Sequence, residues 1–260
     1  MAFKQLKLWF DKDLAHLLSD KIIEVDPEFN AHTFIRKVDQ GVQPLELKDR
    51  VELIADELHQ ALGKSYLENL TALSQILGPE NEKETGMFSN FYWIMPIAKY
   101  VEKYGLDDFD VSMEVIKEIT KRNTSEYAIR PFIEKYPDST IDRMLDWSTH
   151  SNFHVRRLSS EGARPRLPWA SKLDIFIQDP SSLLPILENL KDDPSRYVQK
   201  SVANCINDIL KDNPEIGKGL IDSWLGDAAK ERKWIIKHAL RNLIKKKDKW
   251  ALSVLDLIDS

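Results

Sequence analysis

The chain has 260 residues, of which 42% are hydrophobic and 30% charged, and its formal net charge is −5 at pH 7. This composition excludes wholesale disorder, and the length suits one large domain or two ordinary ones. A single cysteine, Cys205, excludes an internal disulfide and a cysteine-rich metal site, and the lack of a long apolar run or a signal-peptide core predicts a cytosolic protein with no membrane span.

Helical periodicity dominates the chain. Apolar residues recur at spacings of three and four, which predicts helices over 51–58, 111–119, 182–190, 198–210 and 234–244. Helix-start signals, in which a capping residue stands before a proline or an apolar run, occur at Ser139, Asp179, Asp193 and Asn213. Strand-like alternation is absent. We therefore predict an all-α fold of roughly fourteen helices in antiparallel pairs.

A four-residue motif recurs within these helices. It consists of an aromatic residue or His, an aliphatic residue, a variable residue and a cation, and it begins at Tyr127, His154, Tyr197 and Trp234. Irregular spacing of this size favours a HEAT-like α–α superhelix, a solenoid of stacked helix pairs. We predict one repeat domain over 1–260, with N-terminal helices in 1–90 and, in 91–260, repeats whose concave face binds DNA.

The segment 154–170 is the most informative part of the chain. It holds four arginines and one carboxylate and ends in a Pro-rich turn that carries an aromatic residue. We predict a helix over 154–161 that is stopped by Gly162, and a loop stiffened by Pro165 and Pro168 that presents Trp169. Cations, a carboxylate and a held aromatic ring are the groups needed to bind a polyanion and to handle a positively charged ring on it.

The predicted cations form a row. Residues 1–153 hold 18 Lys and Arg against 27 Asp and Glu, whereas residues 154–260 hold 19 against 15. In a solenoid the equivalent residue of each repeat points the same way, so the motif cations suit the phosphates of a duplex. The predicted DNA-binding residues are Arg130, Arg156, Arg157, Arg164, Arg166, Lys200, Asn204, Lys237 and Arg241. The alternative is that these residues are ordinary helix-surface partners of neighbouring carboxylates.

Three carboxylates share helix faces with this row. Glu126 is four residues before Arg130, Glu161 is four after Arg157, and Asp208 is eight after Lys200. A carboxylate beside DNA is useful if the target is a cation, because it stabilises positive charge on the base and on the departing sugar, or orients the attacking water. We therefore predict that all three are catalytic. The alternative is that each only neutralises a nearby cation.

Two tryptophans are candidates for stacking on a base. A Trp face attracts a cationic ring, and Trp169 is placed for this by its loop. Trp93 lies in an aromatic run and is the second candidate. The alternative for Trp169 is a plug between repeats, and the alternative for Trp93 is core packing. The pair His150 and His154 lacks an obvious third ligand, so no metal and no cofactor are expected.

The run from Arg156-Arg157 to Trp169 resembles the signature of the DNA alkylation repair glycosylases of the AlkC family, relatives of AlkD. The resemblance extends to segments 3–10, 127–132, 201–208 and 237–241. It implies that Glu126, Glu161 and Asp208 match the family's pocket carboxylates and that the enzyme acts without a deep base-flipping pocket. Some members carry an additional immunoglobulin-like domain, and this chain is expected to be the shorter form.

The expected activity is hydrolysis of the N-glycosidic bond of cationic N3-alkylated bases, chiefly 3-methyladenine and also 3-methylcytosine. A cationic lesion already carries the charge that a general acid would supply to a neutral base. The expected partner is double-stranded DNA with alkylated bases, bound by a monomer in the bacterial cytosol or nucleoid. Two alternatives are open: a non-catalytic HEAT-like module that binds DNA or an acidic protein, and an inactive relative that senses damaged DNA.

Overall fold

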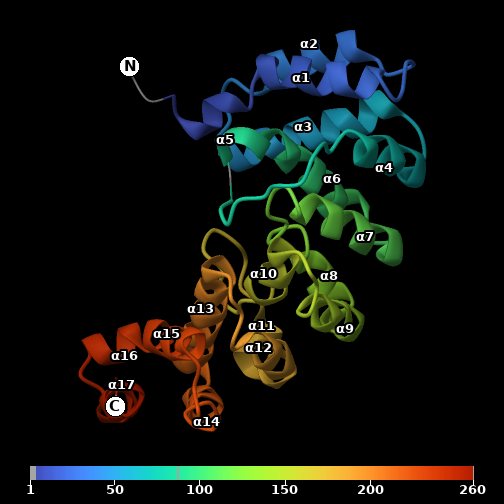
Figure 1. Cartoon of the computed structure of the whole chain (residues 1–260). Helices are drawn as coiled ribbons and strands as arrows, with labels where there is room; N and C mark the ends of the chain where they lie inside the picture. The colour runs from blue at the N-terminus through green and yellow to red at the C-terminus, as the bar shows by residue number, and fades with distance from the viewer. Residues whose placement is uncertain (1–3, 87, 260) are drawn as a thin grey trace. The chain divides into compact units, whose positions relative to one another are not determined.

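A computed structural model describes residues 4–86 and 88–259 of the chain. Across these residues the regular structure is helical and contains no strand, which confirms the predicted all-α class (Figure 1). The chain separates into two compact units, 1–128 and 129–260, called unit 1 and unit 2 below. The predicted single domain, with N-terminal helices in 1–90 and repeats in 91–260, stays a prediction. In the described part of the chain no helix is long and apolar enough to cross a membrane.

Unit 1 is built from helices that follow one another along the chain. Its α-helices and 3-10 helices are η1 (Leu6–Trp9), α1 (Lys12–Ile23), α2 (Ala31–Gly41), α3 (Leu47–Leu62), α4 (Tyr66–Gln75), α5 (Phe88–Phe91), η2 (Tyr92–Ile94), α6 (Met95–Tyr104) and α7 (Phe109–Thr120). The start of α4 is fixed by a capping box, in which the Ser65 hydroxyl accepts from the Glu68 N–H and the Glu68 carboxylate accepts from the Ser65 N–H. Helix α3 packs against α2 and α6, so apolar faces of neighbouring helices form the core of this unit.

Unit 2 holds the segment that the sequence singled out. Its helices are α8 (Arg130–Lys135), α9 (Pro137–Trp147), α10 (Phe153–Glu161), α11 (Asp174–Gln178), η3 (Ser181–Leu183), α12 (Leu184–Leu190), α13 (Arg196–Asp212), α14 (Pro214–Ser223), α15 (Lys230–Ala239), α16 (Arg241–Lys245) and α17 (Lys249–Asp259). Several of these, such as α8, α11 and α16, have only five or six residues. Helices this short show too few turns for periodicity to reveal them, which is why the sequence predicted fewer helices than the described residues contain.

Helix α13 is the central element of unit 2. It packs against α10, α14 and α15, and Figure 1 shows α10 and α15 beside it. Its start is capped by Ser195, whose hydroxyl accepts from the Val198 N–H. Val202, Ile206 and Ile209 continue a fully buried stripe at spacings of three and four. Burying each such side chain contributes about 1.5–3 kcal/mol, so this stripe is what holds α13 between its neighbours.

Helix α10 ends at Glu161, where the sequence predicted, but for a different reason. Gly162 has φ −63°, so it does not use the left-handed conformation expected of a glycine that stops a helix. A Cβ at this position would lie 2.6 Å from Ile129 Cγ2 and 3.1 Å from the Leu158 carbonyl oxygen. The glycine is therefore required by close packing of α10 against the chain before α8.

Candidate functional site

The centre of unit 2 is a cluster in which one arginine joins two buried carboxylates. The Arg164 guanidinium donates from Nη1 to Glu161 Oε1 at 3.0 Å and from Nε to Asp208 Oδ2 at 2.9 Å. Glu161 ends α10 and Asp208 lies near the end of α13, so the packing of these two helices brings together residues that are far apart in sequence. We call Glu161, Arg164 and Asp208 the carboxylate cluster. All three side chains are buried.

The two carboxylates have opposite electrostatic surroundings. Burial disfavours the charge of Glu161, but the guanidinium charges of Arg157 and Arg164 and a hydrogen bond from Ser201 outweigh it and lower its pKa. Burial raises the pKa of Asp208, with the charge of Glu161 adding to the shift, although Arg164 acts against it. Glu161 is thus held as a carboxylate, whereas Asp208 accepts a proton more readily than an exposed aspartate does.

A second arginine flanks the cluster on the α10 side. Arg157 Nη2 lies 3.7 Å from Glu161 Oε1, as the helical spacing of four residues predicts. Its guanidinium carbon also lies 4.4 Å from the centroid of the Tyr197 ring on α13. A guanidinium stacked on a ring is held in place and keeps its charge available, so Arg157 is a fixed cation next to Glu161.

The loop between α10 and α11 carries Trp169 as predicted. Trp169 is 81% exposed and has φ +65°, a left-handed conformation that a non-glycine residue adopts at a cost. The Ala170 N–H donates to the Leu167 carbonyl across the turn at 3.3 Å. The prediction that this ring faces outward rather than plugging a gap between repeats fits its exposure, and its contact with a base stays a prediction.

Arg130 differs from its prediction as a phosphate contact. It is only 2% exposed, and its guanidinium donates to the carbonyls of Gly162 and Arg164 at 2.9 Å each and of Ser171 at 2.6 Å. The guanidinium of Arg130 points inward, because a buried guanidinium needs nearby acceptors for its N–H groups and three carbonyls of one loop provide them. Arg130 therefore fixes the loop that begins next to the carboxylate cluster and carries Trp169.

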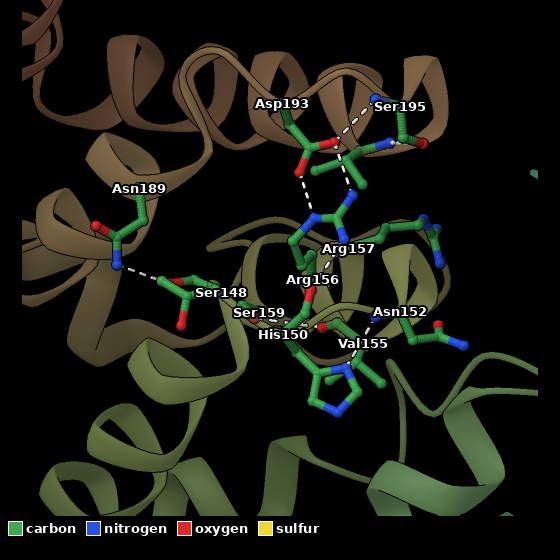
Figure 2. Close-up of polar contacts among 12 residues, drawn as sticks. Ser148, His150, Asn152, Val155, Arg156, Arg157, Ser159, Asn189, Asp193 and Ser195 are labelled. Carbon is green, nitrogen blue, oxygen red and sulfur yellow. Dashed lines mark hydrogen bonds and ion pairs between the residues drawn. The ribbon is translucent and has the colours of Figure 1, made fainter.

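Other predicted DNA-binding arginines are also engaged within unit 2. Figure 2 shows Arg156 reaching from α10 to the loop before α13, where Nε donates to Asp193 Oδ2 at 2.6 Å and Nη2 to Oδ1 at 3.2 Å. Arg166 makes a similar pair with Asp212, with both distances 2.6 Å. Such bidentate pairs each hold a helix to a neighbouring loop. In this structure Arg156, Arg164 and Arg166 act as connectors rather than as open phosphate contacts.

The remaining predicted cations lie on α13, α15 and α16 and are more accessible. Lys200 is exposed, and Lys237 is exposed but lies 3.2 Å from the Asp259 carboxylate. Arg241 is half-buried and donates to Asn204 Oδ1 at 2.9 Å. Asn204 thus orients Arg241. Contact of these four residues with DNA stays a prediction. Lys200, which is exposed, is the first candidate for such a contact.

Two predictions in unit 1 meet different surroundings from those expected. Glu126 lies in the turns after α7, where the Thr124 hydroxyl donates to its Oε2 at 2.8 Å, and α8 begins only at Arg130. Because Pro131 occupies the first turn of that helix, the helical spacing assumed between Glu126 and Arg130 is absent. Trp93 is 7% exposed, with Lys21 Nζ 4.7 Å from its ring centroid, so its position favours core packing over stacking on a base.

Reasoning from the sequence overlooked residues that complete the site. Tyr197 supports Arg157, Ser201 hydrogen-bonds Glu161, and Arg196 lies on the Trp234 ring. The signal for the rings was present, because Tyr197 and Trp234 both open the recurring four-residue motif. Among the described residues no group of three or more His, Cys, Asp or Glu side chains is placed to hold a metal ion. The site described above offers fixed charges and an exposed ring.

Comparisons with known proteins agree with this arrangement. A family model described as DNA alkylation repair enzyme matches residues 50–243. The protein YhaZ of Bacillus subtilis (strain 168), described as uncharacterised, is 39% identical over 250 residues, which cover 96% of this chain and 67% of YhaZ. The structure of Pseudomonas fluorescens alkylpurine DNA glycosylase AlkC, bound to DNA containing an abasic site analog, matches with a TM-score of 0.88 and 36% identity, over 98% of this chain and 69% of that one.

The structural match confirms the predicted all-α helical-repeat fold. The family match spans most of the chain, from α3 to α16, and includes Glu161, Trp169 and Asp208. Both comparisons agree with the resemblance noted in the segment from Arg156 to Trp169. The chain belongs to the family of DNA alkylation repair enzymes.

Proposed function

We propose that the chain is a DNA glycosylase that hydrolyses the N-glycosidic bond of cationic N3-alkylated bases, with 3-methyladenine as the main substrate and 3-methylcytosine as a second one. It acts as a monomer on double-stranded DNA. The observation that carries this proposal is the carboxylate cluster: Arg164 holds Glu161 and Asp208 at fixed positions at the start of the loop that projects Trp169. The similarity to the alkylpurine DNA glycosylase AlkC supports the same reaction class.

The chemistry follows from charge. An N3-alkylated base carries a positive charge and leaves without protonation, so the enzyme needs no general acid. As the bond breaks, the sugar develops oxocarbenium character, and a carboxylate that is already ionised and fixed stabilises it without reorganisation. Glu161 meets this requirement, because neighbouring guanidinium groups lower its pKa. We assign Asp208 to orienting the attacking water or to sharing the charge of the sugar.

Trp169 supplies the contact with the base. A cation over a Trp face gains about 0.5–2 kcal/mol, depending on how far water is excluded, and neutral bases gain less. The exposed ring therefore favours the alkylated base over its unmodified neighbours. Glu126, which matches the third carboxylate of the family resemblance, is assigned a supporting electrostatic role.

The test is single-turnover release of free 3-methyladenine from methylated duplex DNA at saturating enzyme. Glu161→Gln and Asp208→Asn should each slow release by about 10²–10³, the usual effect of removing one aimed electrostatic contact. The matched control is Asp26→Asn, which removes a buried carboxylate from an ion pair with Lys64 in unit 1 and should keep the wild-type rate. Circular dichroism checks that each variant folds.

Two outcomes would contradict the proposal. Wild-type rates in both folded variants would mean that Glu161 and Asp208 only pair with Arg157 and Arg164. Tight binding of methylated DNA by the wild-type protein without release of any base would favour the non-catalytic binding module.

A further inference from the structure

Three side chains from α13 and α15 form a stack at the edge of unit 2. The guanidinium carbon of Arg196 lies 4.0 Å from the centroid of the Trp234 ring. The rings of Trp234 and His238 are 4.8 Å apart and nearly parallel, at 10°. Trp234 and His238 share a face of α15 because they are four residues apart. The stack runs from an exposed arginine, across a tryptophan, to a half-buried histidine.

The stack is surrounded by positive charge. Lys200 lies one turn after Arg196 on α13 and is exposed. Arg241, the first residue of α16, donates to the His238 carbonyl at 2.7 Å. Within the described residues no hydrogen bond or ion pair joins Arg196, Lys200 or His238 to a carboxylate. We call Arg196, Lys200, His238 and Arg241 the cation cluster.

The carboxylates on the elements packed around this cluster are engaged elsewhere. On α17, Asp259 lies against Lys237, and in the loop before α13 Asp192 pairs with Arg232. On α13, Asp208 is held by Arg164, although its charge also acts on Arg241. On α15, Glu231 lies 3.6 Å from Lys230. The charges that act on His238 are those of Arg241, Lys200 and Arg196. Burial and these charges together lower the pKa of His238.

Such a cluster is built to receive an anion. Like charges that are held together repel one another, and a ring under Arg196 fixes its guanidinium at little further entropic cost. A phosphodiester brings the negative charge that would relieve this repulsion, and it favours the charged imidazole by the same interaction. Arg196 and Asp208 are twelve residues apart on α13, about 18 Å along the axis, so the end of the cluster at Arg196 lies away from the carboxylate cluster. Arg241 lies between the two, because it contacts Asn204 and the charge of Asp208 acts on it.

We propose that the cation cluster is a phosphodiester-binding site for the backbone of duplex DNA, and that His238 takes up a proton when the phosphodiester binds. The identity of the ligand as DNA rests on the proposed function. The site itself does not depend on excision, because an undamaged duplex offers the same backbone.

The linkage has a definite sign. His238 titrates below the ordinary histidine pKa of about 6.5 in the free protein and above its free value in the complex. Affinity for the duplex therefore rises as pH falls through the interval between the two values, and it is constant above and below that interval. Each unit by which binding raises the pKa of His238 gives up to about tenfold tighter binding at low pH.

The experiment measures the Kd of the full chain for an undamaged duplex by fluorescence anisotropy, from about pH 5.5 to about pH 8 at constant ionic strength. The wild-type protein should bind more tightly at the acid end. His238→Gln should bind like wild type at the alkaline end and lose this gain. Its matched control, His32→Gln, removes an exposed histidine of α2 and should keep the wild-type pH dependence.

Arg196→Ala should weaken binding at every pH by about three- to tenfold and reduce the salt dependence by about one phosphate contact. Arg36→Ala, which removes an exposed arginine of α2, is its control. NMR titration of the His238 ring in the wild-type protein, with and without duplex, measures the proton uptake directly and needs no variant. The same NMR titration with inorganic phosphate in place of duplex, at matched ionic strength, should raise the His238 pKa less than the duplex does if the duplex backbone is the ligand.

The outcomes separate this inference from the proposed function. An unchanged His238 pKa on adding duplex, or the wild-type pH dependence in a folded His238→Gln variant, would overturn the inference even if 3-methyladenine is released normally. Conversely, the expected binding changes without any release of base would retain the cation cluster and overturn the glycosylase. A rise in the His238 pKa with inorganic phosphate but not with duplex would make the site one for free anions rather than for DNA.

Discussion

Trp169 occupies a backbone conformation that usually belongs to glycine. Its φ of +65° costs a residue with a Cβ about 1–2 kcal/mol, and a side chain that is 81% exposed gains little from burial in return. The loop keeps this arrangement because Arg130 holds its carbonyls on both sides. A strained and exposed aromatic ring is typical of a residue retained for binding rather than for stability.

Replacing Trp169 by Gly should therefore separate stability from activity. We expect the free energy of unfolding of Trp169→Gly, measured by urea denaturation, to stay within about 1 kcal/mol of wild type or to rise, because glycine relieves the strain. The single-turnover release of 3-methyladenine should fall. Trp169→Phe, which keeps a ring at the same place, should retain part of the activity. A loss of stability well beyond 1 kcal/mol in the glycine variant would assign the ring a packing role instead.

The arginines show which part of the site the sequence could predict. Spacing placed Arg157 next to Glu161 correctly, because four residues on one helix are a local relation. Arg130, Arg156 and Arg164 looked equivalent in sequence, yet each is used inside unit 2. Whether a guanidinium faces water or backbone depends on partners about thirty to forty residues away, and local patterns carry no information about these.

At the scale of elements, the relation between α10 and α13 decides the site. The periodicity predicted α13, and Gly162 placed the end of α10 at Glu161. The recurring motif singled out Tyr197 and Trp234, but these are the second residue of α13 and the fifth of α15, so their places in the two helices differ. The side-by-side packing of these helices and the bridge from Arg164 to Asp208 were not predictable, because no motif specifies how two helices are aligned. Short helices such as α11 and α16 lack the length for a periodic signal.

The close packing at Gly162 gives a test of that alignment. Gly162→Ala should lower the free energy of unfolding by about 1–3 kcal/mol, because its Cβ would lie 2.6 Å from Ile129 Cγ2 and 3.1 Å from the Leu158 carbonyl oxygen. A β-branched side chain has a restricted χ1 and a helical carbonyl is fixed, so neither neighbour can yield easily. The control Gly219→Ala, where no atom lies within 4 Å, should be neutral or stabilising by up to about 1 kcal/mol.

A double-mutant cycle by urea denaturation identifies the cause. In an Ile129→Ala background, Gly162→Ala should cost at least about 1 kcal/mol less than in wild type, since residues in contact are energetically coupled. Additive effects of the two substitutions would show that Gly162 is needed for its backbone alone.

At the scale of the whole molecule, charge is distributed unevenly. Unit 1 has 15 Lys and Arg against 23 Asp and Glu, whereas unit 2 has 22 against 19. Much of the negative charge of unit 2 is neutralised by arginines, as for Asp193 and Asp212. A net charge of −5 therefore conceals a unit that can attract a polyanion.

Binding of an undamaged duplex should accordingly weaken as salt concentration rises, despite the negative net charge. If three or four cations contact phosphates, log Kobs should fall with log salt with a slope of about −3. Lys200→Ala should reduce the magnitude of the slope by about 0.9, and Lys83→Ala in unit 1 should leave it unchanged. Anisotropy titrations at several salt concentrations measure this, and an affinity independent of salt would rule out an electrostatic grip on the backbone.

Helix α13 carries Arg196 and Lys200 near one end and Asp208 near the other, without interruption. It therefore sets the distance between the proposed phosphodiester contact and the proposed catalytic carboxylate. A substitution in α13 changes one side chain and leaves this distance unchanged. One inserted residue rotates the rest of the helix by about 100° and shifts it by about 1.5 Å. Arg196 and Asp208 would then no longer face the same DNA strand. Across homologous proteins, the length of this segment should vary far less than its composition.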